Sequence, residues 1–542
     1  MSRPARSWLQ WPATGGVWVV LLLALALEFP YFERTRNANE RPRLMQAMAW
    51  VDADEWAIDG VAARGLDAGP DTARSGVDGR LYPNKPPGTT IVAAAGYRVA
   101  RALHGDALDL RTLTFWARVF AGVLPTLALA WLLWRRHAPV FGFGPAMAAV
   151  LTWALATPAI AYGHLLYGHA LAACALHAGI LAIAWARERE DPRRWPWLLL
   201  GGALAGASIG VEYMAAFAGI PIGAVLLLAI VRAEPWQRRT RLLEAAAALG
   251  GAVVPVAMLA TYHQRVFGSP WSTGYLHATV ADFAAAHGQG LMGLTAPSWT
   301  STHAQFFAVD AGLLWWAPAV VLGGWGLLMA GRDPARRFEA QLHIGIIVVF
   351  VWMNASLAFD GGWRVGPRYF ALALPSFVLG WAECYAQLRR SPPWITIAVA
   401  LVTYGIVVDG LAANLWPHID VDNVDAPVPE LLLPLLEGGL RPWLAFGRAS
   451  THDPLIGLLA LSVVTFALVF ARVIEPGIRT WSSMLAGIVL GLAMVGAHGW
   501  LPRHPRGARN LAYVESVWEP KGATARSVAL PELQRPARPR TH

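Results

Sequence analysis

The chain has 542 residues, of which 56% are hydrophobic and only 15% are charged, and its formal net charge is +9. Repeated apolar runs of about 20 residues exclude a soluble globular protein and predict an all-α polytopic membrane protein. The basic residues lie mostly in short loops between these runs, where the positive-inside rule accounts for them. We therefore expect membrane lipids around the chain and no nucleic-acid partner.

About thirteen apolar segments are long enough, or nearly so, to cross a hydrocarbon core of ~30 Å as helices. They are 15–32, 111–134, 141–163, 167–186, 195–212, 214–232, 242–262, 311–330, 341–359, 369–388, 394–415, 455–472 and 481–500. The first follows a short basic N-terminus but no small-x-small cleavage site follows it, so we expect a retained span rather than a signal peptide. Prolines inside several segments, among them Pro158, Pro318 and Pro375, are expected to be kinks that a packed bundle tolerates.

The segment 88–103 decides the topology, because it is short and carries Arg98 and Arg101 in its second half. If it crossed the membrane, the basic loops at 135–136 and 187–194 would both lie outside. If it lies along the surface, all six strongly basic loops lie inside, so we predict an interfacial helix. The N-terminus is then inside and the C-terminus outside. The predicted outer segments are 33–110, 164–169, 212–213, 263–310, 360–368, 416–454 and 501–542.

Two charged motifs occur in the first outer loop. Glu40 and Arg43 are three residues apart, so they share a face if a helix begins there. The alternative is a solvated pair worth only ~0.3–0.5 kcal/mol. Lys85 is followed by Pro86 and Pro87, which hold the backbone extended and direct the ammonium group, as suits a lipid phosphate. The alternative is an ordinary junction between a loop and a helix.

A second rich stretch runs from Phe359 to Tyr369 and combines glycines with Trp363, Arg364 and Arg368. Glycines allow a ligand to approach the backbone closely, and guanidinium groups bind phosphate in a bidentate manner. The alternative is an interfacial anchor that binds lipid head groups in general. A third outer turn carries His169, for which we favour packing or hydrogen bonding over a metal site.

These motifs resemble those of polyprenyl-phosphate-dependent glycosyltransferases of the GT-C fold. The similar features are a first span, an outer loop with an acid-x-x-Arg helix start, and Tyr-x-x-Lys-Pro-Pro before an amphipathic helix. The most similar members are the lipid A aminoarabinose transferases, the rhizobial lipopolysaccharide galacturonosyltransferases and the protein O-mannosyltransferases. The similarity is specific over about 1–190 and 355–380 and only topological elsewhere.

The resemblance implies a GT-C bundle of about 13 transmembrane helices with interfacial helices in the first outer loop. It also implies that Glu40 is the catalytic base, although the family usually has Asp there. His169 stands where aminoarabinose transferases carry a second acid. The substrate-binding residues that we predict are Arg43, Tyr82, Lys85, His169, Trp363, Arg364, Arg368 and Tyr369.

The predicted activity is that of an inverting membrane glycosyltransferase. It would move a sugar from a polyprenyl-phosphate-linked donor to an extracytoplasmic lipid, glycan or protein acceptor. We expect the bacterial cytoplasmic (inner) membrane with the active site on its outer, periplasmic face, no cofactor, and a divalent metal only as an open alternative. One rival is a transporter or flippase of lipid-linked sugars, which ionisable residues buried mid-span would favour. Another is a scaffold without chemistry, in which Glu40 and Lys85 would lie far apart.

This interpretation divides the chain into five parts. They are the first transmembrane helix (1–32), the outer loop with interfacial helices and the catalytic motif (33–110), the core GT-C transmembrane module (111–390), the C-terminal transmembrane helices (391–500) and an outer tail (501–542).

Overall fold

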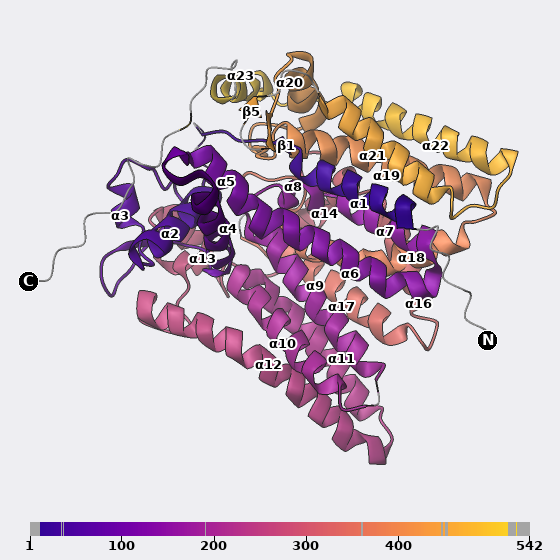
Figure 1. Cartoon of the computed structure of the whole chain (residues 1–542), viewed down its shortest axis with the longest axis horizontal. Coiled ribbons are helices and arrows are strands. Elements are labelled where there is room, and N and C mark those ends of the chain that lie inside the picture. The colour runs from indigo at the N-terminus through magenta and orange to yellow at the C-terminus, as the bar shows by residue number, and fades with distance from the viewer. Residues whose placement is uncertain are drawn as a thin grey trace, which may run out of the picture.

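A computed structural model describes residues 11–518 apart from 34, 36, 190, 359–360, 446–447 and 450–453, together with residue 527. The described chain is a bundle of helices with two small antiparallel sheets (Figure 1). The predicted outer tail, 501–542, falls mostly outside the described residues beyond α23 (Gly507–Val517).

Seven helical segments of the described chain are long and apolar enough to cross a membrane. They are α5–α6 (Leu110–Phe141, with a π-turn at Val119–Val123), α9 (Gly168–Arg187), η4–α11 (Tyr213–Val231), α12 (Pro235–Phe267), α17 (Arg337–Ala355), α19 (Pro392–Asn414) and α22 with η10 (Ile478–Trp500). Shorter apolar helices are α1 (Trp11–Ala26), α7 (Phe143–Leu155), α16 (Val320–Ala330) and α21 (Pro454–Phe470). With α10 (Arg194–Val211) and α18 (Val378–Gln387), they account for the thirteen predicted segments. The prediction of an all-α polytopic protein is confirmed.

Three of the predicted spans are interrupted at a proline, where we expected only kinks. α7 ends before Pro158 and α8 (Ala159–Gly163) follows it, and Pro318 separates α15 (Leu313–Trp316) from α16. The predicted span 369–388 begins with two 3₁₀ turns, Arg368–Leu372 and Leu374–Phe377, the second of which contains Pro375. Proline lacks the backbone N–H and clashes with the preceding turn, so the α-helix does not continue through it. By contrast, Pro255 lies inside α12 without interrupting it.

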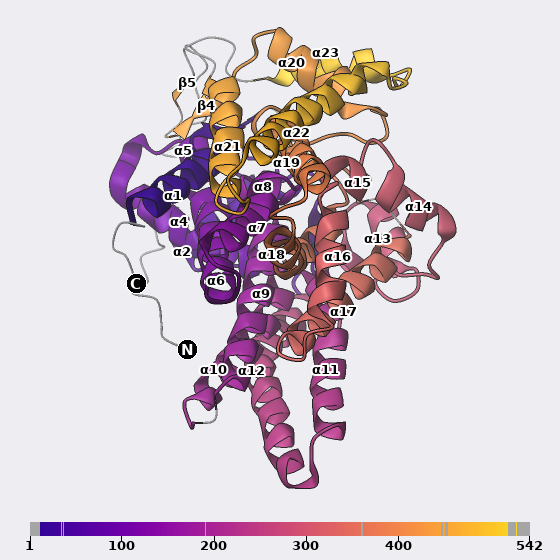
Figure 2. The same cartoon turned by 90° about the vertical axis from the view of Figure 1, so that its right-hand side faces the viewer.

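Large apolar side chains cover the outside of several spans. Leu227 on α11, Val254 on α12 and Leu485 on α22 are each about 60% exposed. Soluble proteins rarely show such continuous apolar surfaces, whereas acyl chains cover them in a membrane. Figure 2 shows α10, α11 and α12 extending well beyond the rest of the bundle.

Ion pairs connect the predicted inner loops to one another. Arg136 pairs with Glu188 at 2.5 Å and with Glu339 at 2.7 Å, which links three predicted inner loops. Arg390 pairs with Glu475 at 2.7 Å, which links two more. Glu244 pairs with both Arg194 and Arg241, which adds the basic loop before it, and Arg336 pairs with Glu383, six residues before Arg389. The loops that the arginine count assigned to the inside therefore lie at one common end of the bundle.

The opposite end carries the first predicted outer loop. This loop folds into α2 (Glu40–Ala53), α3 (Asp59–Ala62), the hairpin β2 (Thr72–Arg74) and β3 (Leu81–Pro83), and α4 (Gly88–His104). In Figure 1, α2, α3 and α4 lie together with α13 (Ala281–Gly288) at the left of the molecule.

The predicted interfacial segment 88–103 forms α4, and both ends of α4 lie at this end of the molecule. Lys85, just before α4, contacts Asp71 of the same loop. Arg111, just after it, lies 3.7 Å from the ring centroid of Trp443 in the predicted outer segment 416–454. That segment forms β4 (Trp443–Leu444), which pairs with β1 (Glu28–Phe29) and β5 (Arg448–Ala449), and also α20 (Leu433–Glu437). α4 therefore does not cross the bundle, in agreement with the arginine count.

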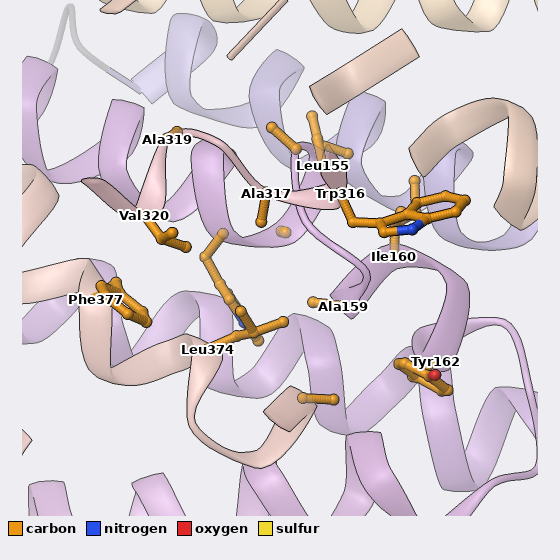
Figure 3. Packing of buried hydrophobic residues seen from close by; sticks show 14 of the residues in the cluster. Leu155, Ala159, Ile160, Tyr162, Trp316, Ala317, Ala319, Val320, Leu374 and Phe377 are labelled. Atoms are coloured by element: carbon orange, nitrogen blue, oxygen red, sulfur yellow. The ribbon is translucent and has the colours of Figure 1, made fainter. Parts of the chain in front are cut away.

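The main hydrophobic core lies beneath this end and supports the loop that carries Arg368. Figure 3 shows side chains from residues 155–162, 316–320 and 374–377 packed in one cluster. Tyr162 extends from it and donates a hydrogen bond to Val365 O at 2.9 Å. Gly366 has a φ of +60°, and a Cβ there would lie 2.8 Å from Pro158 and 3.3 Å from Trp316. The core thus fixes the backbone two residues before Arg368.

The crossing of α16 and α18 provides a test of this packing. A Cβ at Gly326 would lie 1.8 Å from the carbonyl oxygen of Gly380, whereas a Cβ at Gly324 would meet nothing within 4 Å. We expect Gly326→Ala to force the helices apart and to lower the free energy of unfolding by about 1–3 kcal/mol. Gly324→Ala, two positions earlier on the same helix, should leave it unchanged or raise it slightly, because alanine favours the helix over glycine. Thermal unfolding of the two purified variants in detergent measures the difference, and equal melting temperatures would contradict the packing.

Candidate functional site

The hairpin β2–β3 places an acid beside the predicted lysine. Its register pairs Thr72 with Pro83, so Asp71 lies opposite Asn84. The Asn84 backbone N–H donates to Asp71 O at 3.1 Å, and Asn84 Nδ2 donates to Asp71 Oδ1 at 3.3 Å. Lys85 is the next residue, and its Nζ lies 3.4 Å from Asp71 Oδ2.

Lys85 is enclosed by residues of another loop. Its side chain is only 7% exposed, and its Nζ lies 4.5 Å from the ring centroid of Tyr275. His287 of α13 stacks on the Tyr275 ring, with centroids 4.2 Å apart. The close approach of Gly274 to Asn84 holds this loop against the lysine, because a Cβ at Gly274 would lie 2.8 Å from the Asn84 backbone. The lysine is therefore directed by its surroundings as well as by its two prolines.

Arg368 and Arg43 bring two more cations to the same region. Arg368 donates to the Tyr369 hydroxyl at 3.0 Å, and its Nε has no hydrogen-bond partner among the described residues. Arg43 is fully buried and donates through Nη1 to the backbone and side-chain oxygens of Asn39, at 2.8 and 2.6 Å. Its Nε and Nη2 have no partner within the described part of the chain. Buried donors without a partner are costly, so the Arg368 guanidinium, which lines a cavity, is suited to bind a ligand's oxygen. Arg43 lines neither of the two larger cavities and contributes its charge from behind the wall.

A cavity of about 410 Å³ opens at Lys85 and Arg368. Its wall comes from five of the predicted outer segments. The lining residues are Asn37, Ala38, Asn39, Pro70, Asp71, Lys85, Tyr167, Phe283, Ala286, His287, Gly361, Gly362, Trp363, Arg368, Tyr369 and Asp422. Segments far apart in the sequence thus converge on one site, at the end of the bundle opposite the basic loops.

A second cavity of about 320 Å³ shares part of this wall. Arg368 and Tyr369 line both cavities, and Arg364 lines only the second. The second cavity carries the polar side chains of Ser301 in α14 (Trp299–Phe307) and Asn354 in α17. Two spaces therefore meet at one arginine and one tyrosine.

Electrostatics distinguish the two carboxylates near the first cavity. Burial opposes ionisation of Asp71, but the charges of Lys85, Arg368 and Arg43 hold the pKa of this carboxyl below its usual range. Burial raises the pKa of Glu212, which lies between α10 and η4, against the same three cations. Burial also lowers the pKa of Lys85, and Asp71 counteracts this effect. Three cations against two acids leave the region suited to an anion.

Glu40, the predicted base, lies outside this cavity and is surrounded by donors. Arg118 donates to both of its oxygens, from Nε at 2.8 Å and from Nη2 at 2.7 Å. The Leu166 backbone N–H donates to Oε1 at 2.6 Å, and Asn37 Nδ2 donates to Oε2 at 2.9 Å. Burial disfavours the charge, but the Arg118 guanidinium holds the pKa of Glu40 below its usual value of 4.5. This arrangement favours a structural role for Glu40, and its catalytic role stays a prediction without support from the geometry.

Asn37 links Glu40 to the wall of the cavity. It approaches His418 Nε2 at 3.2 Å, and His418 Nδ1 lies 3.3 Å from the Tyr167 hydroxyl. Burial lowers the pKa of His418 to about 4, so this imidazole is neutral near pH 7. Asn37 Oδ1 also accepts from the backbone N–H groups of Asn39 and Glu40 at the start of α2. The ion pair thus positions the asparagines that line the cavity.

Three other predicted residues, Trp363, His169 and Tyr82, lie in different places relative to the cavity. Trp363 lines the first cavity, together with Lys85, Arg368 and Tyr369. His169 is buried behind the wall, with its ring at 5.5 Å from Tyr369 and its Nδ1 at 3.5 Å from Glu212 Oε2. Tyr82 does not line either cavity; its hydroxyl donates to Asp78 at 2.7 Å and its ring packs on Phe267.

Asp71 is the residue that sequence reasoning missed. The Asp78-Gly79 pair between two short strands was a turn signal that predicts a hairpin. The signal does not give the register, because a two-residue turn at these positions would pair Thr72 with Lys85, whereas the structure pairs Thr72 with Pro83. Asn39, His287 and Tyr167 have no comparable local signal.

Among the described residues, no group of three or more His, Cys, Asp or Glu side chains could hold a metal ion. No protein-family model matches the chain, and no curated protein matches it.

Three solved structures of glycosyltransferases have partial similarity to the chain. ArnT from Cupriavidus metallidurans bound to undecaprenyl phosphate shares 16% identity, covering 91% of this chain and 80% of that one, with a TM-score of 0.47. The archaeal oligosaccharyltransferase AglB from Archaeoglobus fulgidus shares 11%, covering 96% and 61%, with a TM-score of 0.45. The arabinosyltransferase EmbB from Mycobacterium smegmatis shares 13%, covering 95% and 44%, with a TM-score of 0.40.

The structural role of Glu40 predicts a loss of stability on substitution. Glu40→Gln leaves the buried Arg118 charge without a partner, which costs about 3–5 kcal/mol when a buried pair is broken. Thermal unfolding of the purified variant in detergent measures this. Glu475→Gln is the matched control, because the Arg390–Glu475 pair is exposed and contributes little. Equal melting temperatures for the two variants would show that the buried pair is not structural.

The same pair predicts a pH dependence. Because the folded-state pKa of Glu40 is lowered, its contribution is fully present above 4.5, the usual value, and is lost as the pH falls through the folded-state pKa. The difference in melting temperature between wild type and Glu40→Gln should therefore shrink below about pH 4.5 and stay constant from pH 6 to 8. A difference that grows on acidification would contradict the assignment.

Proposed function

We propose that this protein transfers a sugar from a polyprenyl-phosphate donor to an acceptor on the outer side of the membrane, and that its bundle is of the GT-C type. The observation that carries the proposal is the cavity in which Lys85 and Arg368 face a buried carboxylate at the end of the bundle opposite the basic loops. The motif resemblance over residues 1–190 and 355–380 supports the same reaction.

The phosphate of the donor fits the part of the cavity wall formed by Lys85 and Arg368, which we call the cationic wall. As the bond between the anomeric carbon and oxygen breaks, the phosphodiester monoanion becomes a phosphomonoester dianion, so negative charge grows at the phosphate. Cations positioned where charge develops stabilise the transition state more than the ground state. Lys85 and Arg368 occupy that place in the proposal, and the charge of Arg43 supports them from behind the wall.

The sugar fits the aromatic part of the same wall. Trp363, Tyr369, Tyr167 and His287 all line the cavity. Aromatic faces pack against the apolar face of a sugar ring, while their polar ends and the asparagine amides bond its hydroxyls.

The position of the cavity supports an extracytoplasmic reaction. The wall residues come from the segments that the positive-inside rule places outside, and the ion-paired basic loops lie at the other end. For a bacterial chain this is the periplasmic face of the inner membrane. The acceptor is then a lipid, a glycan or a protein exposed there.

One observation favours the rival, a transporter or flippase of lipid-linked sugars. Asp409 is fully buried within the span α19, and neither of its oxygens has a hydrogen-bond partner in the described chain. Carboxylates in spans are a feature of ion-coupled transport. Asp409 lines neither cavity, however, and transport alone does not require the cations and a carboxylate at one outer wall. A flippase would move the lipid-linked sugar without any covalent change.

A direct test compares cell-envelope glycans with and without this protein by mass spectrometry. The proposal expects one sugar residue, or more, to be missing from an envelope lipid, glycan or protein in the deletion strain and to return on complementation. Accumulation of the lipid-linked sugar on the inner leaflet of the deletion strain would favour the flippase, because movement of the lipid to the outer leaflet would then be the step that is lost.

Binding of the lipid phosphate tests the cationic wall. We expect purified protein in detergent to bind undecaprenyl phosphate and to discriminate against undecaprenol, which lacks the phosphate. Lys85→Ala should weaken binding of undecaprenyl phosphate by about ten- to a hundredfold, since a charge-assisted hydrogen bond contributes ~1.5–3 kcal/mol.

Arg101→Ala is the matched control for Lys85→Ala. Arg101 lies on α4, the helix that follows Lys85, and its side chain is 41% exposed in a pair with Asp52. Its removal should leave affinity unchanged. Equal losses in the two variants would mean that the lipid responds to overall charge rather than to the cavity.

A further inference from the structure

Asp71 is a buried carboxylate on the cavity wall, and neither the motif resemblance nor the sequence pattern drew attention to it. It is 6% exposed, and it is one of two acids among the described residues that line the cavity. The other, Asp422, is exposed to solvent. A general base must have an oxygen or nitrogen lone pair within hydrogen-bond distance of the proton that it removes. A carboxylate on the cavity wall meets this condition for a substrate bound in the cavity.

We propose that Asp71 takes the proton of the acceptor hydroxyl in this cavity, a role that rests on the glycosyl transfer proposed above. The acceptor oxygen forms a bond to the anomeric carbon, and the bond from that carbon to the phosphate oxygen breaks. The bonding electrons leave with the phosphate, whose new charge Lys85 and Arg368 balance. The hydroxyl proton passes to Asp71 and then to solvent.

Two buried glutamates near the cavity, Glu40 and Glu212, are less suited to this step. Glu40 accepts four hydrogen bonds, two of them from one guanidinium group, and lines a separate small cavity. Glu212 lines neither of the larger cavities and lies behind His169. Neither presents an oxygen to the space that a donor would occupy.

The contacts of Asp71 leave its oxygens available. Asn84 Nδ2 reaches Oδ1 only at 3.3 Å, and Lys85 Nζ is 3.4 Å from Oδ2. An ionised carboxylate accepts about four hydrogen bonds, so capacity remains for an acceptor hydroxyl. Because Lys85 pairs with this carboxylate and also lines the cavity, a bound phosphate competes with Asp71 for the ammonium group and leaves the carboxylate freer to accept a proton.

Removal of the charge on Asp71 separates two roles that this residue could have. As a base, Asp71 contributes to transfer but repels the phosphate, so Asp71→Asn should abolish transfer and bind undecaprenyl phosphate at least as tightly as wild type. As a residue that only positions Lys85, its replacement should weaken lipid binding. General-base catalysis typically contributes ~10²–10⁴-fold, so the loss of transfer should exceed a hundredfold.

The experiment uses full-length protein in two assays. Undecaprenyl phosphate binding is measured in detergent for wild type, Asp71→Asn and Asp282→Asn, and each variant is used to complement the deletion strain for envelope-glycan mass spectrometry. Asp282→Asn is the matched control, because it removes an exposed acid of α13 that lines neither cavity, and it should restore the glycan. Loss of the glycan with retained or tighter lipid binding in Asp71→Asn alone supports the proposal.

Three results overturn it, and they are distinguishable. A wild-type glycan from Asp71→Asn rejects Asp71 as the base and leaves the proposed function intact. Loss of both the glycan and lipid binding assigns Asp71 to positioning Lys85. Failure of the wild-type protein to prefer undecaprenyl phosphate over undecaprenol rejects the proposed function itself.

A second variant covers the case in which Asp71→Asn does not fold. Asp71→Ala leaves space for a small carboxylate, so formate added to membrane vesicles of the complemented strain should restore transfer to Asp71→Ala and not to Lys85→Ala. Restoration in neither variant, with both proteins present in the vesicles, overturns the base assignment.

Discussion

The buried pair between Glu40 and Arg118 is the interaction on which the outer end depends. It joins the start of α2 to the long helix α5–α6, and the Leu166 backbone N–H adds the turn before α9. Arg118 also donates to Pro30 O at 2.7 Å, so the end of the first span is held at the same point. A buried pair stabilises only when its remaining donors and acceptors are satisfied, and here they are. From this point Asn37 and Asn39 extend to the wall of the cavity.

The topology could be predicted from the sequence because it depends on composition. Counting arginines placed 88–103 on the outer side, and the contacts of Lys85 and Arg111 at the two ends of α4 agree. The inner ion pairs give the physical reason: basic loops at one end attract the acids of neighbouring loops, as Arg136 does with Glu188 and Glu339. The sequence predicted kinks at three prolines where the structure has interruptions of the helix. Such interruptions are tolerated because a packed core can satisfy the backbone groups that an interrupted helix exposes.

The site could be predicted only in part, because its residues meet through contacts distant in sequence. Lys85 and Arg368 carried local signals, namely two prolines and a run of glycines. Glu40 was expected to share a face with Arg43, three residues away, but its partner is Arg118, which is 78 residues away. Asp71 depends on the register of a hairpin, and a slip of one residue would turn its side chain to the other face. Spacing along the chain does not contain that information.

The sharing of Arg368 and Tyr369 by two cavities has a thermodynamic consequence. A ligand that draws the guanidinium group toward one space removes it from the wall of the other, so occupancy of the two spaces is energetically coupled. Linkage requires the coupling to be reciprocal: whatever factor a ligand in the second cavity applies to lipid-phosphate affinity, the lipid phosphate applies to that ligand. A compound bound only in the second cavity would therefore act on the first without touching it, through one side chain that both walls require.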